Sequence, residues 1–242
     1  MKPVALFLLL CFGLPSMVWG QSVPQSREIV ERSVAFHDPQ GAWENYQAEL
    51  DIILSRPGVE VDLPSTVTID RPADLVMIYQ DRDSVQLLQG LKQGEPYVEV
   101  DGMPGASEED IRAYNLTANR IEYLHNYYLY LYGIPMKLLV DPATEIGEAT
   151  RVTFHGMEVF RVPVSYGEPW AQHDWAFYFD VNTYEMKAYQ FWRKSPEEDG
   201  EYILCEGLET IAGIRHPKVR YWYMNADDLH IATDTLLPAT HQ

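Results

Sequence analysis

The amino-acid sequence predicts an α+β fold in which a large, curved antiparallel sheet, a half-barrel, wraps around one long tyrosine-rich helix, with a short helix at the N-terminus. Many short segments rich in β-branched and aromatic residues follow one another along the chain, separated by compact turns. Between them lies one long segment of helical periodicity that is apolar or aromatic around most of its circumference. Such a helix must be buried on several sides, and a curved sheet provides that enclosure.

Residues 1–20 have the features of a secretory signal peptide. Lys2 supplies a positive charge, the run VALFLLLCFGL supplies an apolar core, and Gly20 fits the last small-residue position of a cleavage site. A lipid anchor on Cys11 is disfavoured, because this cysteine follows three leucines where a small residue is required. The apolar run is also too short for a membrane span, which takes about 20 residues. We therefore expect export to the periplasm or the extracellular space, no stable membrane insertion, and a mature chain, residues 21–242, that forms a single half-barrel domain.

The first part of the mature chain is predicted to form a short helix and then a series of strands. Residues 24–37 place apolar side chains at helical spacing, and Ser26 is a suitable N-cap. From Trp43 the period changes, because every second side chain is apolar or aromatic, as in a half-buried strand. Further strands are predicted where Pro, Gly and Asp separate short apolar runs, at residues 66–70, 75–82, 85–92 and 96–100.

Residues 107–132 form the long helical segment. Ser107 followed by Asp110 has the form of a capping box, and the two glutamates between them favour the positive end of the helix dipole. A break is expected near residues 115–117, and Gly133 followed by a proline is a helix stop.

From residue 151 onward the sequence returns to short strands. The compact turns between them favour antiparallel pairing, and the strands are predicted at residues 151–155, 158–166, 174–180, 184–192, 201–211, 218–223 and 229–236. Pro163 lacks an N–H and is expected in an edge strand or at a bulge.

Residues 123–132 contain five tyrosines and three leucines. A buried tyrosine hydroxyl without a hydrogen-bond partner costs on the order of 1 to 3 kcal/mol, so an ordinary dry core favours Leu, Ile and Phe instead. Two arrangements satisfy these hydroxyls. Either they reach water at the rim of the sheet, or they line a cavity of mixed polarity.

The strands after residue 173 carry aromatic side chains on both faces, which is more than a sheet with one covered face needs. Alternation places Trp175, Phe177 and Phe179 on one face of their segment, and it sets Met186, Ala188 and Trp192 against Tyr189 and Phe191. Arg220 points to the same face as Trp222, and it is either an exposed strand residue or one that stacks on a ring or holds a carboxylate head group. The candidate ligand-binding residues are Tyr123, Tyr127, Tyr130, Trp175, Phe177, Trp192, Arg220 and Trp222.

The formal net charge of the chain is −18, or −19 after removal of Lys2. Nucleic acids and anionic membranes are therefore not expected as partners, because both attract basic patches. A solvated acidic surface explains the charge, with calcium binding as the alternative. The acidic segments 81–84 and 197–201 do not have EF-hand spacing, and the second is better interpreted as an acidic hairpin turn.

No catalytic residue, metal ligand or cofactor is assigned from the sequence. The seven histidines are scattered, HExxH is absent, and the adjacent pair His173 and Asp174 would point to opposite faces of a strand. The GxSxG, P-loop and GxGxxG motifs are also absent. Cys205 is the only cysteine of the mature chain, so it has no internal disulfide partner, and we expect a small core residue rather than a nucleophile.

Five segments carry a family resemblance: YYLYLYGIPMKLLVDPAT, DWAFYFDVNTYEMKAYQFW, DGEYILCEG, VRYWYMNAD and IATDTL. They resemble an uncharacterised family of exported bacterial proteins that is defined only as a domain of unknown function. The resemblance covers nearly all of the mature chain, and the first two segments are its most specific part. The order of a helix within a curved sheet is more remotely similar to periplasmic lipoprotein carriers of the LolA and LolB type, whose half-barrel holds acyl chains. No functional residue of those carriers matches a position here, so none is carried over.

Together these features favour an exported, non-enzymatic protein that binds or carries a hydrophobic or amphiphilic molecule, such as a lipid or an acyl chain, between the helix and the sheet. Two alternatives stay open. One is an envelope hydrolase with an unfamiliar site, for which titratable side chains would converge in one pocket. The other is an interaction module, in which the aromatic surface is a protein interface.

Overall fold

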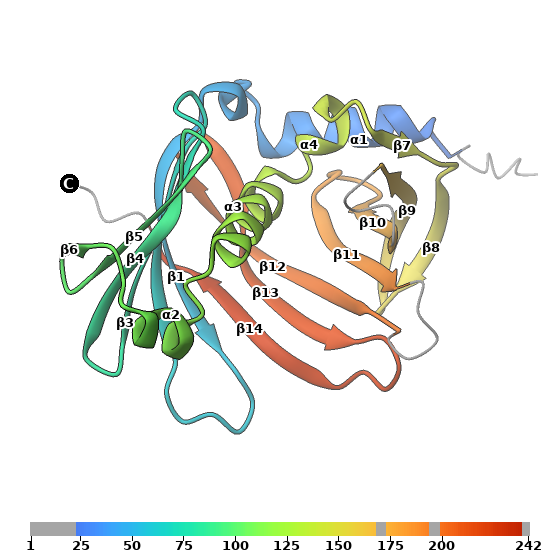
Figure 1. Cartoon of the computed structure of the whole chain (residues 1–242). Coiled ribbons are helices and arrows are strands. Elements are labelled where there is room, and N and C mark those ends of the chain that lie inside the picture. The colour runs from blue at the N-terminus through green and yellow to red at the C-terminus, as the bar shows by residue number, and fades with distance from the viewer. Residues whose placement is uncertain (1–22, 168–172, 194–198, 239–242) are drawn as a thin grey trace, which may run out of the picture.

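The computed structural model describes residues 23–167, 173–193 and 199–238, so the predicted signal peptide and residues 197 and 198 of the predicted acidic turn lie outside the described residues. Within them, fourteen strands form one antiparallel sheet (Figure 1). The strand order is β6-β5-β4-β3-β2-β1-β14-β13-β12-β11-β10-β9-β7, and β8 also pairs with β9. The order has two open ends, so the sheet is not closed into a barrel.

The strands before the long helix are β1 (Gln47–Ser55), β2 (Leu63–Asp70), β3 (Leu75–Arg82), β4 (Val85–Lys92), β5 (Glu95–Val100) and β6 (Met103–Pro104). Those after it are β7 (Thr144–Ile146), β8 (Thr150–Phe154), β9 (Met157–Tyr166), β10 (His173–Asp180), β11 (Met186–Arg193), β12 (Glu201–Ile211), β13 (Ile214–Met224) and β14 (His230–Leu236). The helical elements are α1 (Ser26–His37), the short 3-10 turn η1 (Ala42–Asn45), α2 (Glu108–Tyr114), α3 (Ala118–Gly133) and α4 (Lys137–Val140).

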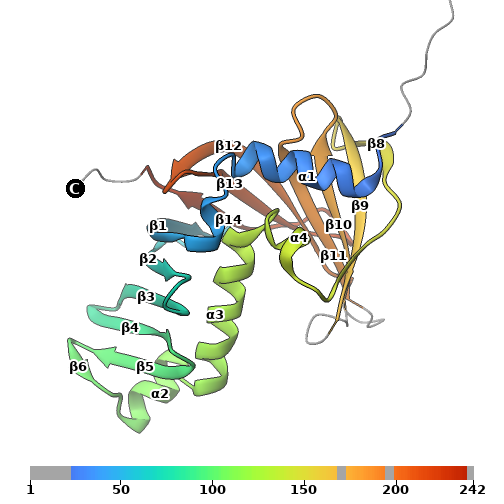
Figure 2. The same ribbon diagram turned by 90° about the horizontal axis from the view of Figure 1, so that it is seen from above.

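The long helix α3 lies inside the curve of the sheet. Figure 2 shows β2 to β5 on one side of α3 and β9 to β11 on the other, while α1 crosses one end of the sheet. The two halves of the sheet join at β1 and β14, where Ile52 pairs with Leu236. The predicted α+β half-barrel around a long helix, with a short N-terminal helix, is thereby confirmed. None of the helices in the described ranges is long and apolar enough to cross a membrane.

The ends of the central helices follow the local sequence signals. Ser107 and Asp110 form the predicted capping box of α2, and Asn115 ends this helix in the left-handed conformation with φ of 54°. Thr117 then caps α3 by accepting a hydrogen bond from the backbone N–H of Arg120. At the last residue of α3, Gly133, a Cβ atom would lie 2.5 Å from the Trp43 ring, so glycine is required there for close packing.

Three local expectations are corrected by the structure. Ser26 is not the N-cap of α1, because Gln25 holds that position and the Ser26 hydroxyl instead accepts a hydrogen bond from the backbone N–H of Ala149. Met186 lies in the core with Tyr189, because a bulge between Tyr178 and Phe179 in the β10–β11 pairing shifts the alternation.

Pro163 does not lie in an edge strand. Its strand, β9, has neighbours on both sides, but β8 pairs with residues 157–161 and β7 with residues 164–166. Pro163, which has no backbone N–H to donate, therefore lies between the two segments of β9 that pair with β8 and with β7.

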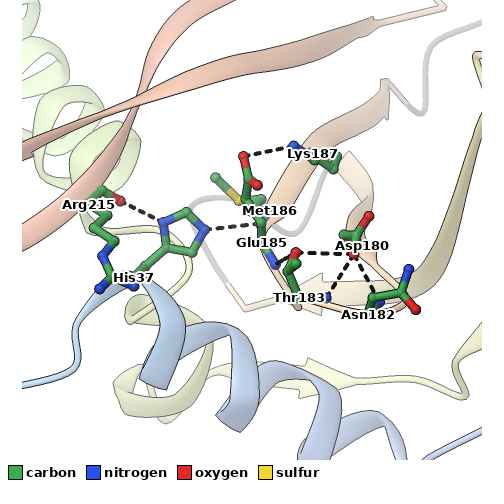
Figure 3. A network of polar contacts seen from close by, with 8 residues as sticks. All are labelled: His37, Asp180, Asn182, Thr183, Glu185, Met186, Lys187 and Arg215. Carbon is green, nitrogen blue, oxygen red and sulfur yellow. Dashed lines mark hydrogen bonds and ion pairs between the residues drawn. The ribbon is translucent and has the colours of Figure 1, made fainter.

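Helix α1 is attached to the sheet through His37. The backbone N–H of Met186 donates to its Nε2 at 3.0 Å, and its Nδ1 lies 2.6 Å from the carbonyl oxygen of Arg215 (Figure 3). Because Nε2 accepts a hydrogen bond, the proton of the neutral ring is on Nδ1, which donates to the carbonyl. In the turn before β11, the Asp180 carboxylate accepts hydrogen bonds from the backbone N–H groups of Asn182 and Thr183, so the turn that presents Met186 is fixed as well.

Burial keeps two histidines of this region neutral. It lowers the pKa of His37 to about 4 and the pKa of His216, whose Nε2 lies 2.9 Å from the Tyr46 hydroxyl, to about 3. In the unfolded chain a histidine has a pKa of about 6.5, so the unfolded state binds more protons below that pH. The stability that these histidines contribute is complete above pH 6.5 and is lost progressively as the pH falls toward 4.

Replacing His37 with Asn keeps a donor for the Arg215 carbonyl but removes the acceptor for the Met186 N–H. We expect the His37→Asn variant to lose about 1 to 3 kcal/mol of unfolding free energy at pH 7. Between pH 6.5 and 4, the unfolding free energy of the variant should fall less steeply with decreasing pH than that of the wild type. The two slopes should differ by up to about 1.4 kcal/mol per pH unit. Urea denaturation across this pH range measures both effects.

The matched control is His155→Asn. His155 is exposed and has a φ of 45°, a conformation that Asn adopts readily, and its main contact is a stack on the Tyr202 ring, so this variant should lose less stability at pH 7 than His37→Asn. A His37→Asn variant with an unchanged pH slope would contradict the assignment.

Candidate functional site

A cavity of about 560 Å³ lies between α3 and strands β10 to β13; we call it the aromatic cavity. The aromatic residues that line it are Tyr123, Tyr127 and Tyr130 from the helix, and Trp175, Tyr189, Phe191 and Trp222 from the sheet. The exposed polar strip of α3, Asn119, Glu122 and Asn126, also lines it. The cavity therefore offers aromatic surface inside and hydrogen-bonding groups at its solvent side.

Local geometry explains why these rings meet. Tyr123, Tyr127 and Tyr130 are spaced by four and three residues, so they share one face of α3. On the sheet, Trp175 is directly opposite Phe191 across the β10–β11 pair, and their ring centroids are 5.0 Å apart. Tyr130 connects the two surfaces, with its ring centroid 5.4 Å from that of Trp175.

A second cavity, of about 450 Å³, lies between α3 and strands β1 to β4 and β14. We call it the arginine cavity, because Arg56, Arg82 and Arg120 line it. The two cavities have Tyr123, Tyr127, Leu131, Glu201 and Trp222 as common lining residues, so they adjoin along α3.

The tyrosine hydroxyls of α3 end in different surroundings. Tyr123 is 46% exposed and reaches solvent, whereas the Tyr130 hydroxyl is hydrogen-bonded to that of Tyr166 at 2.9 Å. Tyr132 is fully buried, and its hydroxyl has no partner within the described residues. Burial raises the pKa of Tyr127 and of Tyr132 above the ordinary value, so both phenols are neutral.

Arg220 lies in the core, only 1% exposed, which corrects the expectation of an exposed strand arginine. Its guanidinium stacks over the Tyr132 ring at 4.8 Å and donates to the Leu131 carbonyl at 3.4 Å, so the alternative of a stacked arginine is confirmed. Desolvation disfavours its charged form, whereas the negative charge of Asp234 favours it, and the pKa of Arg220 is raised above the ordinary value. The buried guanidinium therefore stays charged.

Asp234 is the buried acidic residue across the strand pair from this arginine. The two residues are opposite each other in the β13–β14 pair, and Asp234 also accepts a hydrogen bond from Trp222 Nε1 at 3.2 Å. Burial raises the pKa of the Asp234 carboxyl, and Arg220 opposes that shift. A positive and a negative side chain are thus buried together beneath α3.

The structure brings most of the predicted ligand-binding residues together. Tyr123, Tyr127, Tyr130, Trp175 and Trp222 line the aromatic cavity. Phe177 lies in the core, completely buried, and Arg220 lies beneath α3; neither lines the aromatic cavity.

Trp192 lies on the opposite, convex face of the sheet. It packs against a small cluster that contains Ala176 and Tyr178, and the Arg161 guanidinium lies 5.7 Å from its ring centroid. The reason is the register of the β10–β11 pair, which places Phe191 beside Trp175 and turns the next residue away.

Sequence reasoning missed several lining residues. His173, Tyr189 and Phe191 line the aromatic cavity, and His173 belongs to β10 rather than to the turn before it. The face that Phe191 shares with Tyr189 was readable from alternation, but which face met the helix was not. Nothing in the sequence indicated that Arg56, Arg82 and Arg120, far apart along the chain, line one cavity.

The described part of the chain contains no group of three or more His, Cys, Asp or Glu side chains placed to hold a metal ion. Cys205 lies in the core, as predicted, and burial raises the pKa of its thiol to about 12. This side chain is therefore a protonated, buried thiol at neutral pH.

A model of DUF6503, described as a family of unknown function, matches residues 4–238. Among solved structures, a LolA superfamily protein from Nitrosomonas europaea has a TM-score of 0.52 and 10% sequence identity, with 89% of this chain and 92% of that chain covered. A DUF1329 family protein from Desulfovibrio piger has a TM-score of 0.49 and 10% identity, with 89% and 92% covered. A putative outer membrane lipoprotein-sorting protein domain from Vibrio parahaemolyticus has a TM-score of 0.48 and 10% identity, with 86% and 88% covered.

No match was found among curated proteins. The resemblance of the sequence to a family of unknown function and its remote similarity to the LolA type of architecture are both confirmed. At 10% identity, the LolA superfamily protein shows a common fold and transfers no residue role.

The buried pair beneath α3 gives a direct test of the site's construction. The Arg220→Met variant leaves Asp234 buried without its positive partner, so we expect a loss of roughly 3 kcal/mol of unfolding free energy in urea denaturation. The double variant Arg220→Met/Asp234→Asn should lose less than the sum of the two single variants, by at least about 1 kcal/mol. Strict additivity would contradict an electrostatic coupling between the two side chains.

The control for this pair is Arg151→Met. Arg151 forms an ion pair with Glu158 at 3.3 Å on an exposed part of the sheet, with side chains 47% and 55% exposed. An exposed pair contributes at most about 1 kcal/mol, so this variant should be nearly as stable as the wild type.

Proposed function

We propose that this chain, which belongs to the DUF6503 family of unknown function, binds or carries a hydrophobic or amphiphilic molecule, such as a lipid or an acyl chain, in the aromatic cavity. The observation that carries the proposal is the cavity itself: seven tyrosine, tryptophan and phenylalanine rings from a helix and a sheet line a volume of about 560 Å³. The role is binding without catalysis.

The dimensions and chemistry of the cavity suit such a ligand. Small-molecule sites are mostly apolar cavities of roughly 300 to 1,000 Å³ with a few polar groups. Each methylene group removed from water contributes about 0.8 kcal/mol, so a chain of about ten methylenes gains roughly 8 kcal/mol before the cost of its immobilisation. The polar strip with Asn119, Glu122 and Asn126 forms the solvent side of the cavity.

Two polar groups of the cavity walls support an amphiphile rather than a pure hydrocarbon. Trp175 Nε1 and the Tyr189 hydroxyl are buried, and neither has a hydrogen-bond partner within the described residues. An ordinary core avoids such groups, because each costs about 1 to 3 kcal/mol. A ligand with an ester, carboxyl or hydroxyl oxygen near these walls offsets part of that cost.

The proposal also places the protein outside the cytoplasm. It rests on the signal-peptide features of residues 1–20, and it assigns residues 21–242 to one exported half-barrel domain, periplasmic or extracellular. The fold shared with a LolA superfamily protein supports a half-barrel as the binding element.

Titration with cis-parinaric acid, a fluorescent fatty acid, tests the proposal. The wild type should bind it with a Kd on the order of 1 µM, which corresponds to about 8 kcal/mol. Trp222→Ala removes a ring that lines both cavities and should weaken binding by about tenfold.

Trp192→Ala is the matched control, because it removes the same side chain from the convex face and should leave the affinity unchanged. Two results would overturn the proposed site. One is no uptake by the wild type, and the other is equal losses in the two tryptophan variants.

A further inference from the structure

The geometry points to an anionic ligand: we propose that the arginine cavity binds the negatively charged head group, a carboxylate or a phosphate, of the amphiphile whose chain lies in the aromatic cavity. This inference rests on the proposed function and deepens it by assigning the chemical class of the head group and the residues that hold it. Arg56, Arg82 and Arg120 would supply the positive charge.

The three arginines come from separate parts of the fold. Arg56 directly follows β1, Arg82 ends β3, and Arg120 lies in the first turn of α3. Arg56 and Arg120 are exposed, whereas Arg82 is half-buried, so the group extends from the cavity mouth inward. Three guanidinium groups converging from two strands and a helix form a site that only the folded chain creates.

None of the three arginines forms an ion pair with a side chain in the described ranges, although the chain has 36 acidic and only 18 basic residues. With twice as many acids as bases, arginines that gather without acidic partners are unexpected. Arg82 Nε is buried and has no hydrogen-bond partner within the described residues. An oxyanion with several acceptor oxygens supplies the missing partner, because guanidinium binds carboxylate and phosphate in a bidentate manner.

The arginines lie close enough to repel one another. The pKa of Arg82 is lowered first by desolvation and then by the positive charges of Arg120 and Arg56, and the neighbouring Asp83 opposes this shift only in part. Arg120 has one further contact, a stack over the Tyr123 ring at 5.0 Å, which leaves its donors free. Like charges held together in this way favour an anion between them.

The acidic groups that face this cavity do not cancel its positive charge. Glu201 is paired with Arg193 at 3.2 Å. Asp234 is opposite the buried Arg220 and accepts a hydrogen bond from Trp222. The charge of Arg56 also lowers the pKa of Asp234, so this carboxylate interacts with one of the three arginines. Three arginines nevertheless line the cavity against two carboxylates, and each carboxylate has a further arginine beside it or across the strand pair.

The arrangement of the two cavities orients the ligand. They adjoin through common walls that include Tyr127, Leu131 and Trp222. A single molecule can therefore place its charged head among the arginines and its chain among the aromatic rings. Gln80 and Gln89 also line the arginine cavity, and their buried Oε1 atoms have no hydrogen-bond partner within the described residues.

Isothermal titration with three ligands of equal chain length tests this inference. Dodecanoate and dodecyl phosphate carry the two candidate anions, and 1-monododecanoylglycerol carries a neutral head group. A charge-assisted hydrogen bond contributes about 1.5 to 3 kcal/mol, so Arg82→Gln should lower the affinity for both anionic ligands by about tenfold or more. The triple variant Arg56→Gln/Arg82→Gln/Arg120→Gln should lower the affinity for both anions by about a hundredfold. Its affinity for the neutral ligand should change by less than about twofold.

Arg112→Gln is the matched control. It removes an exposed arginine of α2 that is paired with Glu108 at 3.5 Å, and it should leave all three affinities unchanged. Urea denaturation of each variant verifies that it is folded. The ratio of the dodecyl phosphate and dodecanoate affinities then indicates whether the head group is a phosphate or a carboxylate.

The outcomes separate this inference from the proposed function. If the neutral ligand binds the wild type as tightly as the anionic ones, or if the triple variant keeps its affinity for the anions, the arginine site is refuted while the aromatic cavity stands. If none of the three ligands binds the wild type, both are refuted.

Discussion

The enclosure of α3 by a curved sheet is the constraint on which the rest of the structure depends. This helix is apolar or aromatic around most of its surface, so it is stable only where several sides are covered. The sheet covers them by curving around α3, with β2 to β5 on one side and β9 to β11 on the other. Two cavities adjoin α3 within this enclosure, and tyrosines of the helix line both of them.

The polar groups of the interior follow from the same enclosure. A charged Arg220 is buried beneath α3, where it stacks on Tyr132, binds the Leu131 carbonyl and faces Asp234 across the β13–β14 pair. Buried charges of this kind give little net stability, but removing one partner is costly. Through its contacts with Leu131 and Tyr132, Arg220 connects α3 directly to β13. At the end of the sheet, His37 attaches α1 through hydrogen bonds to Arg215 and Met186.

Most of the fold was predictable because the signals are local. The strands β3 and β4 occupy the predicted residues, the break between α2 and α3 lies at Asn115, and α3 ends at Gly133. Short elements such as α4 and β7 were missed, since they depend on tertiary packing. Alternation identified the two faces of β10 and β11, but a bulge reassigned Met186 and the cross-strand register excluded Trp192. The arginine cavity was not predictable, because its three arginines meet only in the fold.

The central claim is that the tyrosine helix forms the inner wall of an amphiphile-binding cavity. Native mass spectrometry of the protein, purified gently from its own cells and followed by organic extraction, tests this claim most directly. A fraction of the protein should carry an added mass, and the extract should contain an anionic single-chain or double-chain amphiphile. A population that has only the mass of the polypeptide, and that takes up no amphiphile when one is added, would contradict the claim.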